Sequence, residues 1–316
     1  YGIYKTTDGG DSWQYLALSK VGAFSRLWVH PMNSDIIYAG AVERQAGFYI
    51  STDAGETWQR TRTDHVTDVG INMDDPDEVV IGVNGKGIFY SSDMGSSWKD
   101  ISGKFRDNCS RVSVQVSESN PEIYYTLLEE GANDRARIYR TDNKGETWDQ
   151  VYFDNSSGGS FFNGQGGYNN YISIKPDDPS IVLAGGIDIW RTMNSGTGWT
   201  NVTNGYSGGS VHVDQHCAAF APSNPSIVYA GNDGGMYKSL NAGKTWININ
   251  NDLQVTQFYA LGVDHLQDNV NYGGTQDNGT LGKINEGFWE RIGGGDGFRT
   301  FVQPGNSNIV YGEMYY

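Results

Sequence analysis

An eight-residue pattern that ends in tryptophan recurs along this chain and constrains its fold more than any other feature. It reads TTDGGDSW at 6–13, and the later copies are STDAGETW at 51–58, SSDMGSSW at 91–98, TDNKGETW at 141–148, TMNSGTGW at 192–199 and SLNAGKTW at 239–246. The tryptophans follow one another at intervals of 40 to 51 residues, and Trp289 follows a degraded copy. Repeats of about 40 to 50 residues are the period of β-propeller blades.

A second pattern precedes the first, and it combines a turn containing Pro or Asp with a β-branched run. Its copies are HPMNSDIIYAG at 30–40, DDPDEVVIG at 74–82, SNPEIYYTL at 119–127, DDPSIVLAG at 177–185 and SNPSIVYAG at 223–231. Short runs that alternate every two residues predict strands, and no stretch has the period of a long amphipathic helix. We therefore expect an all-β fold in which each unit has four short strands.

The two ends of the chain hold two halves of one further unit. PGNSNIVYGEMYY at 304–316 carries the first half, and YGIYKTTDGGDSW at 1–13 carries the second. We therefore expect a single domain over residues 1–316, a seven-bladed β-propeller whose ring is closed by pairing 304–316 with 1–13. Closure of this kind avoids exposed sheet edges.

The tryptophan pattern has the form S/T-x-D-x-G-x-T-W, and we expect it to join the third and fourth strands of each blade. A short Asp or Asn side chain accepts backbone N–H bonds there, Gly supplies a positive φ, and the tryptophan covers the blade face. The third position is Asp8, Asp53 and Asp93 in three copies but Asn143, Asn194 and Asn241 in the others. Because a catalytic or metal-binding role would not survive that exchange, we interpret the pattern as structural.

This pattern resembles the Asp-box, or BNR repeat, and the resemblance covers nearly the whole chain. It is similar to bacterial sialidases, sortilin-type receptor propellers, two-propeller xyloglucanases and a photosystem assembly factor. The combination of VHVDQH, GNDGG, GGTQDNGT and GGGDG resembles secreted, sortilin-like proteins of Bacteroidetes and related bacteria, which are often described as glycosyl hydrolases. The resemblance implies the fold and an extracellular or cell-surface location, but these families do unrelated things, so it leaves the activity open.

Charge and composition limit the partners. The formal net charge of −15 argues against nucleic acid, whose phosphates it would repel. It suits cations, neutral glycans or basic proteins. No apolar run approaches the roughly 18 residues that span a bilayer, so no membrane insertion is expected. Cys109 and Cys217 match no metal spacing, and we expect two buried thiols, with a disulfide as the alternative.

The stretch VHVDQHCAAF at 211–220 is the first candidate for a functional site. Read as an inner strand, it places His212, Asp214 and His216 on one strand face. The three side chains could hold a metal ion or form a polar stripe along the channel. Alternate residues of a strand lie roughly 6.6–6.8 Å apart, which favours the stripe, so no metal site is expected. Asp-rich turns such as DDPDE at 74–78 leave a Ca²⁺ ion open as a cofactor, and no other cofactor is expected.

Further polar residues fall in loops that we expect at the same mouth of the channel, where propellers generally bind their ligands according to the family resemblance. They are Asp188 in GGIDIW, Asp233 in GNDGG, Gln276, Asp277 and Asn278 in GGTQDNGT, and Asp296 and Arg299 in GGGDGFR. We expect ligand binding by His212, Asp214, Asp188, Gln276, Asn278 and Arg299. If the protein is an enzyme, Asp296, Asp277 and Asp233 are the candidate catalytic residues.

Three functions remain open from the sequence. The first is an extracellular binding module for a polysaccharide or a surface protein, alone or within a longer or multi-subunit surface assembly. The second is a glycoside hydrolase or lyase that uses carboxylates of the same mouth, since glycosidases need a pair of them. The third is a structural or adhesion scaffold without pocket chemistry. An open pocket would favour the first two, and a mouth plugged by side chains would favour the third.

Overall fold

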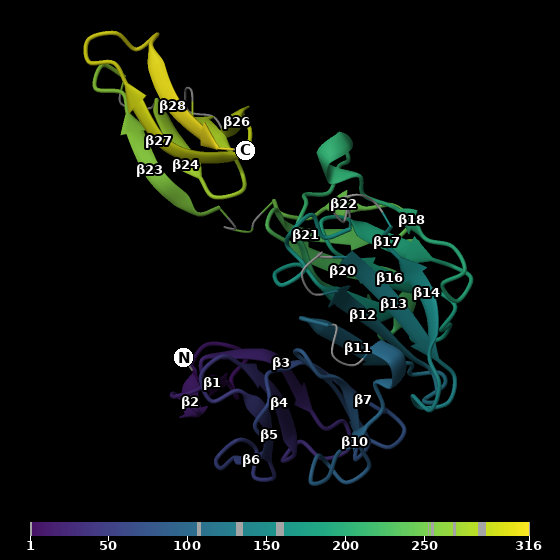
Figure 1. Ribbon diagram of the computed structural model, residues 1–316. Coiled ribbons are helices and arrows are strands. Elements are labelled where there is room, and N and C mark those ends of the chain that lie inside the picture. The colour runs from purple at the N-terminus through teal and green to yellow at the C-terminus, as the bar shows by residue number, and fades with distance from the viewer. Residues whose placement is uncertain are drawn as a thin grey trace.

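The computed structural model is all-β and describes residues 2–105, 109–130, 135–155, 161–251, 253, 256–267, 270–283 and 289–315. Its strands form six four-stranded sheets and two two-stranded sheets, each antiparallel and in chain order (Figure 1). The helical segments in these ranges are two short 3₁₀ turns, η1 (Gly103–Phe105) and η3 (Gly205–Ser207). No helix in the described part of the chain is long and apolar enough to cross a bilayer.

The four-stranded sheets follow the repeats that the sequence predicts. They are β3 (Ala23–Val29), β4 (Ile37–Val42), β5 (Gly47–Ser51), β6 (Gln59–Arg62); β7 (Val66–Ile71), β8 (Val79–Val83), β9 (Gly87–Ser91), β10 (Lys99–Asp100); β11 (Val112–Val116), β12 (Tyr124–Glu130), β13 (Arg135–Thr141), β14 (Asp149–Phe153); β15 (Tyr171–Ile174), β16 (Val182–Gly185), β17 (Ile189–Thr192), β18 (Thr200–Asn201); β19 (Gln215–Ala221), β20 (Asn224–Asn232), β21 (Gly235–Ser239), β22 (Ile247–Asn248); and β23 (Phe258–Val263), β24 (Asn271–Thr275), β25 (Thr280–Lys283), β26 (Glu290–Gly293).

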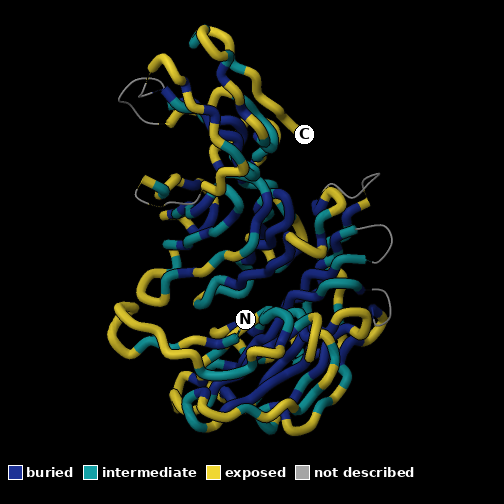
Figure 2. The backbone as a smooth tube through the Cα atoms, turned by 90° about the vertical axis from the view of Figure 1, so that its left-hand side faces the viewer, coloured by how far each residue is buried: buried dark blue, intermediate teal, exposed yellow. Residues whose placement is uncertain are grey.

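The first strands of five successive sheets line one central cavity of about 230 Å³. Its walls come from β3, β7, β11, β15 and β19. This is the arrangement of propeller blades around a channel. Every residue of β5, β8, β15 and β16 is buried. Figure 2 shows buried backbone running through the interior of the molecule, with exposed residues mostly in the outer loops.

The Asp-box lies between the third and fourth strands of each four-stranded sheet from β3 to β22, as the sequence predicts. In the copy at 51–58 the Asp53 carboxylate accepts hydrogen bonds from the Ser51 hydroxyl and the Thr57 backbone N–H, both at 2.8 Å. Gly55 has a φ of +94°, a conformation that favours glycine. Trp58 packs on the neighbouring core cluster. The Asp-box therefore stabilises the turn between the third and fourth strands through bonds within the motif.

The asparagine copies form the same turn. Asn143 Oδ1 accepts from the Thr141 hydroxyl at 2.8 Å and from the Thr147 N–H at 2.9 Å. Its Nδ2 donates to the Thr147 hydroxyl, whereas the Asp53 carboxylate accepts from the hydroxyl of Thr57. In this copy the exchange of Asp for Asn reverses one hydrogen bond and keeps the turn.

The predicted closure of the ring is not confirmed. β27 (Asp296–Val302) pairs with β28 (Val310–Tyr315), and β1 (Ile3–Lys5) pairs with β2 (Gln14–Ala17), but these remain two separate two-stranded sheets among the described residues. β28 and β1 lie apart in Figure 1. Seven blades closed by 304–316 and 1–13 therefore stay a prediction.

No disulfide joins Cys109 and Cys217. Cys109 is buried, as expected, but the expectation of a buried Cys217 is wrong, because this residue is exposed on β19.

Candidate functional site

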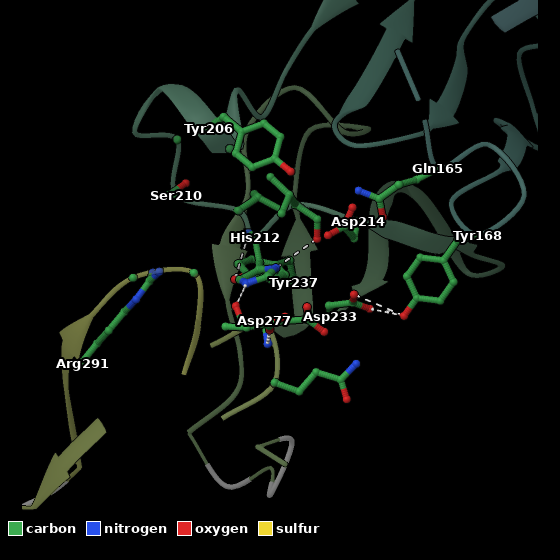
Figure 3. A pocket seen from close by; sticks show the side chains of 18 of the residues that line it. Gln165, Tyr168, Tyr206, Ser210, His212, Asp214, Asp233, Tyr237, Asp277 and Arg291 are labelled. Carbon is green, nitrogen blue, oxygen red and sulfur yellow. Dashed lines mark hydrogen bonds between the residues drawn. The ribbon is translucent and has the colours of Figure 1, made fainter. Parts of the chain in front are cut away.

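A cavity of about 950 Å³ lies where the loops of the sheets β15–β18, β19–β22 and β23–β26 meet the two-stranded sheet β27–β28. Six predicted site residues line it: His212, Asp214, Asp233, Gln276, Asp277 and Asp296. They come from the segment before β19, the β20–β21 turn, the β24–β25 turn and the start of β27. The cavity also contains tyrosines, which Figure 3 shows around the carboxylates.

The segment before β19 differs from the predicted inner strand. β19 begins at Gln215, so His212 and Asp214 lie in the preceding loop and do not alternate along a strand with His216. Asp214 has a φ of +66°, and its N–H donates to the carbonyl of Ile187 at 2.9 Å. The backbone thus bonds to the neighbouring sheet, which breaks the two-residue period but still brings both side chains to the cavity.

Asp233 is the most heavily bonded carboxylate of the cavity. It accepts from the Tyr168 hydroxyl at 3.2 and 3.3 Å (Figure 3). It also contacts His216 Nε2 at 2.5 Å. Burial alone would raise the pKa of Asp233, but the hydrogen bond and charge of His216 and the bond from Tyr168 lower it below its ordinary value. The same environment raises the pKa of Tyr168 to about 12, through burial and the charge of Asp233. Asp233 is therefore an ionised acceptor.

Asp277 is held by its backbone and leaves its carboxyl group to the cavity. Its N–H donates to Asp296 Oδ1 at 2.6 Å, and its carbonyl lies 2.9 Å from His212 Nε2. Within the described part of the chain its carboxyl group has no hydrogen-bond partner. Burial and the charges of Asp233, Asp296 and Asp214 raise the pKa of Asp277 to about 6, although His212 opposes the shift.

Asp214 is buried, with 8% of its surface exposed, and its Oδ1 accepts from Asn169 Nδ2 at 2.6 Å. Burial raises the pKa of Asp214, and the bond from Asn169 opposes this rise. The pKa of Asp277 is also raised, whereas the pKa of Asp233 is lowered. The cavity thus holds carboxyl groups that differ in how readily they carry a proton.

A short loop before β15 contributes side chains that the sequence did not single out as site residues. Tyr168 and Gln165 line the cavity from this loop. Arg111, which precedes β11, braces it by donating from Nη1 to the carbonyls of Gly167 and Tyr168, both at 2.8 Å. The stretch GGYNNY at 166–171 signals the loop in the sequence, but nothing local signals its partner 57 residues earlier.

The same loop is anchored by Phe161 and Phe162, which are fully buried in the core between the sheets β11–β14 and β15–β18. The N–H of Phe161 also donates to Asp154 Oδ2 at 2.8 Å. The wall also contains side chains that the sequence did not predict, namely Tyr206, Tyr237, Ser210, Arg291 and Tyr315.

Three predicted residues do not line the cavity. The Asp188 carboxylate accepts from the Thr203 hydroxyl, the Gly205 N–H and Asn201 Nδ2 at 2.7–2.8 Å, and so holds the loop that carries η3. Asn278 Nδ2 donates to the carbonyls of Asp233 and Gln276 at 3.3 and 3.2 Å. Arg299 is exposed on β27. Asp188 and Asn278 thus bond to residues that line the cavity, Gly205 and Asp233, and hold them in place.

Comparisons with known proteins agree with this fold. A model of the family described as Sortilin-Vps10 (Sortilin, neurotensin receptor 3) matches residues 46–180. A xyloglucanase from Paenibacillus sp. is 26% identical over 277 residues, covering 78% of this chain and 23% of that protein. The chain therefore spans about a quarter of that relative.

Two solved structures share the fold. The crystal structure of the GH74 enzyme of Niastella koreensis has a TM-score of 0.50 at 17% identity, covering 98% of this chain and 64% of that one. YCF48 from Cyanidioschyzon merolae has a TM-score of 0.53 at 14% identity, covering 92% of each chain. At such identities the likeness bears on the fold alone.

Proposed function

We propose that this chain, a sortilin-like Asp-box propeller related to the glycosyl hydrolases, binds a polysaccharide segment at the cavity between β19 and β28. The observation that carries this proposal is the cavity itself, about 950 Å³ and lined by carboxylates and tyrosines. Such a site suits a sugar chain, because carboxylates accept hydrogen bonds from hydroxyl groups and aromatic rings cover sugar faces. Tyr168 and Tyr206 are 50% and 67% exposed, so their rings are accessible.

The relative's name gives the first ligand to test. A xyloglucanase acts on xyloglucan, a neutral polysaccharide, and a neutral ligand avoids the repulsion that an acidic glycan would meet beside Asp214, Asp233 and Asp277. An extracellular or cell-surface location and a polysaccharide partner belong to the same proposal. The open cavity supports it over a scaffold without a pocket.

Calorimetric titration with xyloglucan oligosaccharides tests this function. We expect binding by the wild type and a loss of about tenfold for Tyr206→Ala, since stacking on an exposed ring is removed. Asp11→Asn is the matched control, because Asp11 is exposed in the first Asp-box and does not line the cavity. Failure of the wild type to bind any neutral or charged glycan would end the proposal.

Hydrolysis is the second candidate, and the opposite pKa shifts of Asp233 and Asp277 favour it. A glycosidase needs one carboxyl group that keeps its proton and one that is ionised. Here Asp277, with a pKa of about 6, would be the acid, and Asp233 the base or nucleophile. Asp296, which accepts from the Asp277 N–H, would keep the acid in place.

A reducing-end assay on the same oligosaccharides separates hydrolysis from binding. Loss of the acid should lower the rate by about 10²–10⁴-fold in Asp277→Asn while the oligosaccharide still binds. Turnover by wild type that Asp277→Asn and Asp233→Asn leave unchanged would exclude these residues. Binding without turnover would leave a binding module.

The seven-bladed ring belongs to the proposal as well. Exposed apolar residues on the first strands of two sheets support it. Leu27 and Val29 on β3 and Leu261 and Val263 on β23 are exposed, whereas nearly all of β7, which has a neighbour on each side, is buried. An apolar face of this kind lacks the neighbouring blade that covers it elsewhere. Hydrogen exchange tests the closure. β28 already bonds to β27 and β1 to β2, so only the amides on the other edge of 310–315 and of 3–5 are informative. Protection of those edge amides in both segments would support pairing, and their rapid exchange would refute it.

A further inference from the structure

The wall of the cavity offers hydrogen-bond acceptors that no group of the described residues uses. The carboxyl group of Asp277 has no partner among the described residues, and Asp214 uses only Oδ1, on Asn169. Asn169 is fully buried and does not line the cavity, and its Nδ2 holds Asp214 in place from the protein side. Asp214 does line the cavity with only 8% of its surface exposed, and its Oδ2 has no donor among the described residues. A buried carboxylate oxygen without a donor is uncommon, so a donor belonging to a ligand fits here.

The basic groups around the cavity are already engaged. His216 contacts Asp233, and Arg291 Nε donates to the carbonyl of Gly293 at 3.2 Å. Each ring nitrogen of His212 lies within 3.0 Å of a carbonyl oxygen, that of Val213 or that of Asp277. The wall therefore also presents carboxylate oxygens of Asp214 and Asp277 that none of these basic groups contacts.

An ammonium group has the complementary chemistry, because it carries three donors and no acceptor. A hydroxyl group supplies one donor, and an acetamido group supplies one donor and brings an acceptor of its own. A carboxylate would meet repulsion from three or four aspartates. We propose that the glycan bound in this cavity carries a free amine, as a chain of deacetylated amino sugars does, and that Asp214 and Asp277 receive its ammonium group.

This inference rests on the proposed function and narrows its ligand. The other titratable groups that face Asp277 are Asp233, Asp296, Asp214, His212, Tyr168 and Tyr206. Three of these six are carboxyl groups whose charges raise the pKa of Asp277. A bound cation relieves that repulsion, so binding of the amine should release a proton from Asp277 near its pKa of about 6.

Three tetrasaccharides with one β-1,4-linked backbone test the inference: the glucosamine tetramer, its N-acetylated form and cellotetraose. They differ only in an amine, an acetamide or a hydroxyl at one ring position. Calorimetric titrations at about pH 6, in two buffers of different protonation enthalpy, measure both affinity and proton release. We expect the amine to bind about tenfold more tightly than either neutral tetramer, with the advantage shrinking as salt is raised.

Matched variants locate the effect. Asp277→Asn and Asp214→Asn should each reduce the advantage of the amine, and asparagine suits both positions because both residues have a positive φ. Asp11→Asn removes a charge away from the cavity and should keep the full advantage. A circular dichroism spectrum and a melting temperature check that each variant is folded.

The outcomes separate this inference from the proposed function. Binding of cellotetraose as tight as that of the amine overturns the inference alone. Binding of a lysine tetrapeptide as tight as that of the glucosamine tetramer also overturns it, because the cavity would then bind any ammonium group, whether or not a glycan carries it. Failure of every glycan, xyloglucan oligosaccharides included, overturns both.

Discussion

Replacement of Asp277 by asparagine should stabilise the protein at neutral pH and leave its stability unchanged in acid. The reason is that burial, together with the charges of Asp233, Asp296 and Asp214, raises the pKa of Asp277 from 3.8 to about 6, so its ionisation costs stability. An asparagine side chain carries no charge, and this residue type suits the φ of +58° at this position. The change therefore removes the repulsion and keeps the turn.

The size of the effect follows from the two pKa values. Below pH 3.8 the carboxyl group is protonated in both folded and unfolded chains, so it contributes no difference. Between these values the unfolded chain loses its proton first, and the free energy of unfolding falls as the pH rises towards about 6. At about 1.36 kcal/mol per pH unit the loss is at most about 3 kcal/mol. Because the group is partly exposed and water screens it, we expect about 1 kcal/mol.

Urea unfolding of wild type, Asp277→Asn and the control Asp11→Asn at a series of pH values measures this. The free energy of unfolding of Asp277→Asn should exceed that of wild type by about 1 kcal/mol above about pH 6.5 and by nothing near about pH 3.5. A difference that is constant across this range, or that favours the wild type at neutral pH, would refute the reasoning. Asp11→Asn should follow the wild type throughout.

Three further substitutions test the fold and the site. Asn143→Ala should lower the free energy of unfolding by about 1–2 kcal/mol, because it removes the acceptor of two hydrogen bonds, while Asn143→Asp should stay within about 0.5 kcal/mol, as chemical denaturation can check. Phe161→Ala should cost about 3–5 kcal/mol by the same measurement, since its side chain is fully buried. Arg111→Ala should weaken glycan binding several-fold with a smaller effect in Arg111→Lys, because the loop of Tyr168 loses its brace; equal affinity in calorimetry for all three proteins would show that the brace is not needed.

The repeats were predictable from the sequence because the Asp-box is bonded within eight residues. Every contact of Asp53 that forms the turn, to Ser51 and Thr57, lies inside the repeated phrase. The geometry of such a local motif can be predicted wherever its sequence occurs. The strand order followed from counting along the chain between boxes.

The site was only partly predictable because its contacts cross between repeats. The turns that carry Asp233 and Asp277 were placed from their position after the second strand, and both line the cavity. The brace from Arg111 to Tyr168 joins residues 57 apart, and no local pattern announces it. The φ of +66° at Asp214 likewise depends on a bond to Ile187 in the neighbouring sheet, so the alternation predicted from the sequence failed there.

The aspartates of this chain differ in function because of how many donors surround them. In the Asp-box, donors saturate the carboxylate: the pKa of Asp53 is lowered first by the Thr57 hydroxyl and then by the Thr57 N–H, and an amide can take its place. Asp188 is saturated in the same way by three donors, so it holds a loop. Asp277 faces other carboxylates, and its carboxyl group in the cavity has no hydrogen-bond partner among the described residues. A ligand can donate hydrogen bonds to an aspartate that has none from the protein and that lies in an open cavity. We therefore expect the chemistry at the β24–β25 turn and not in the repeated Asp-box.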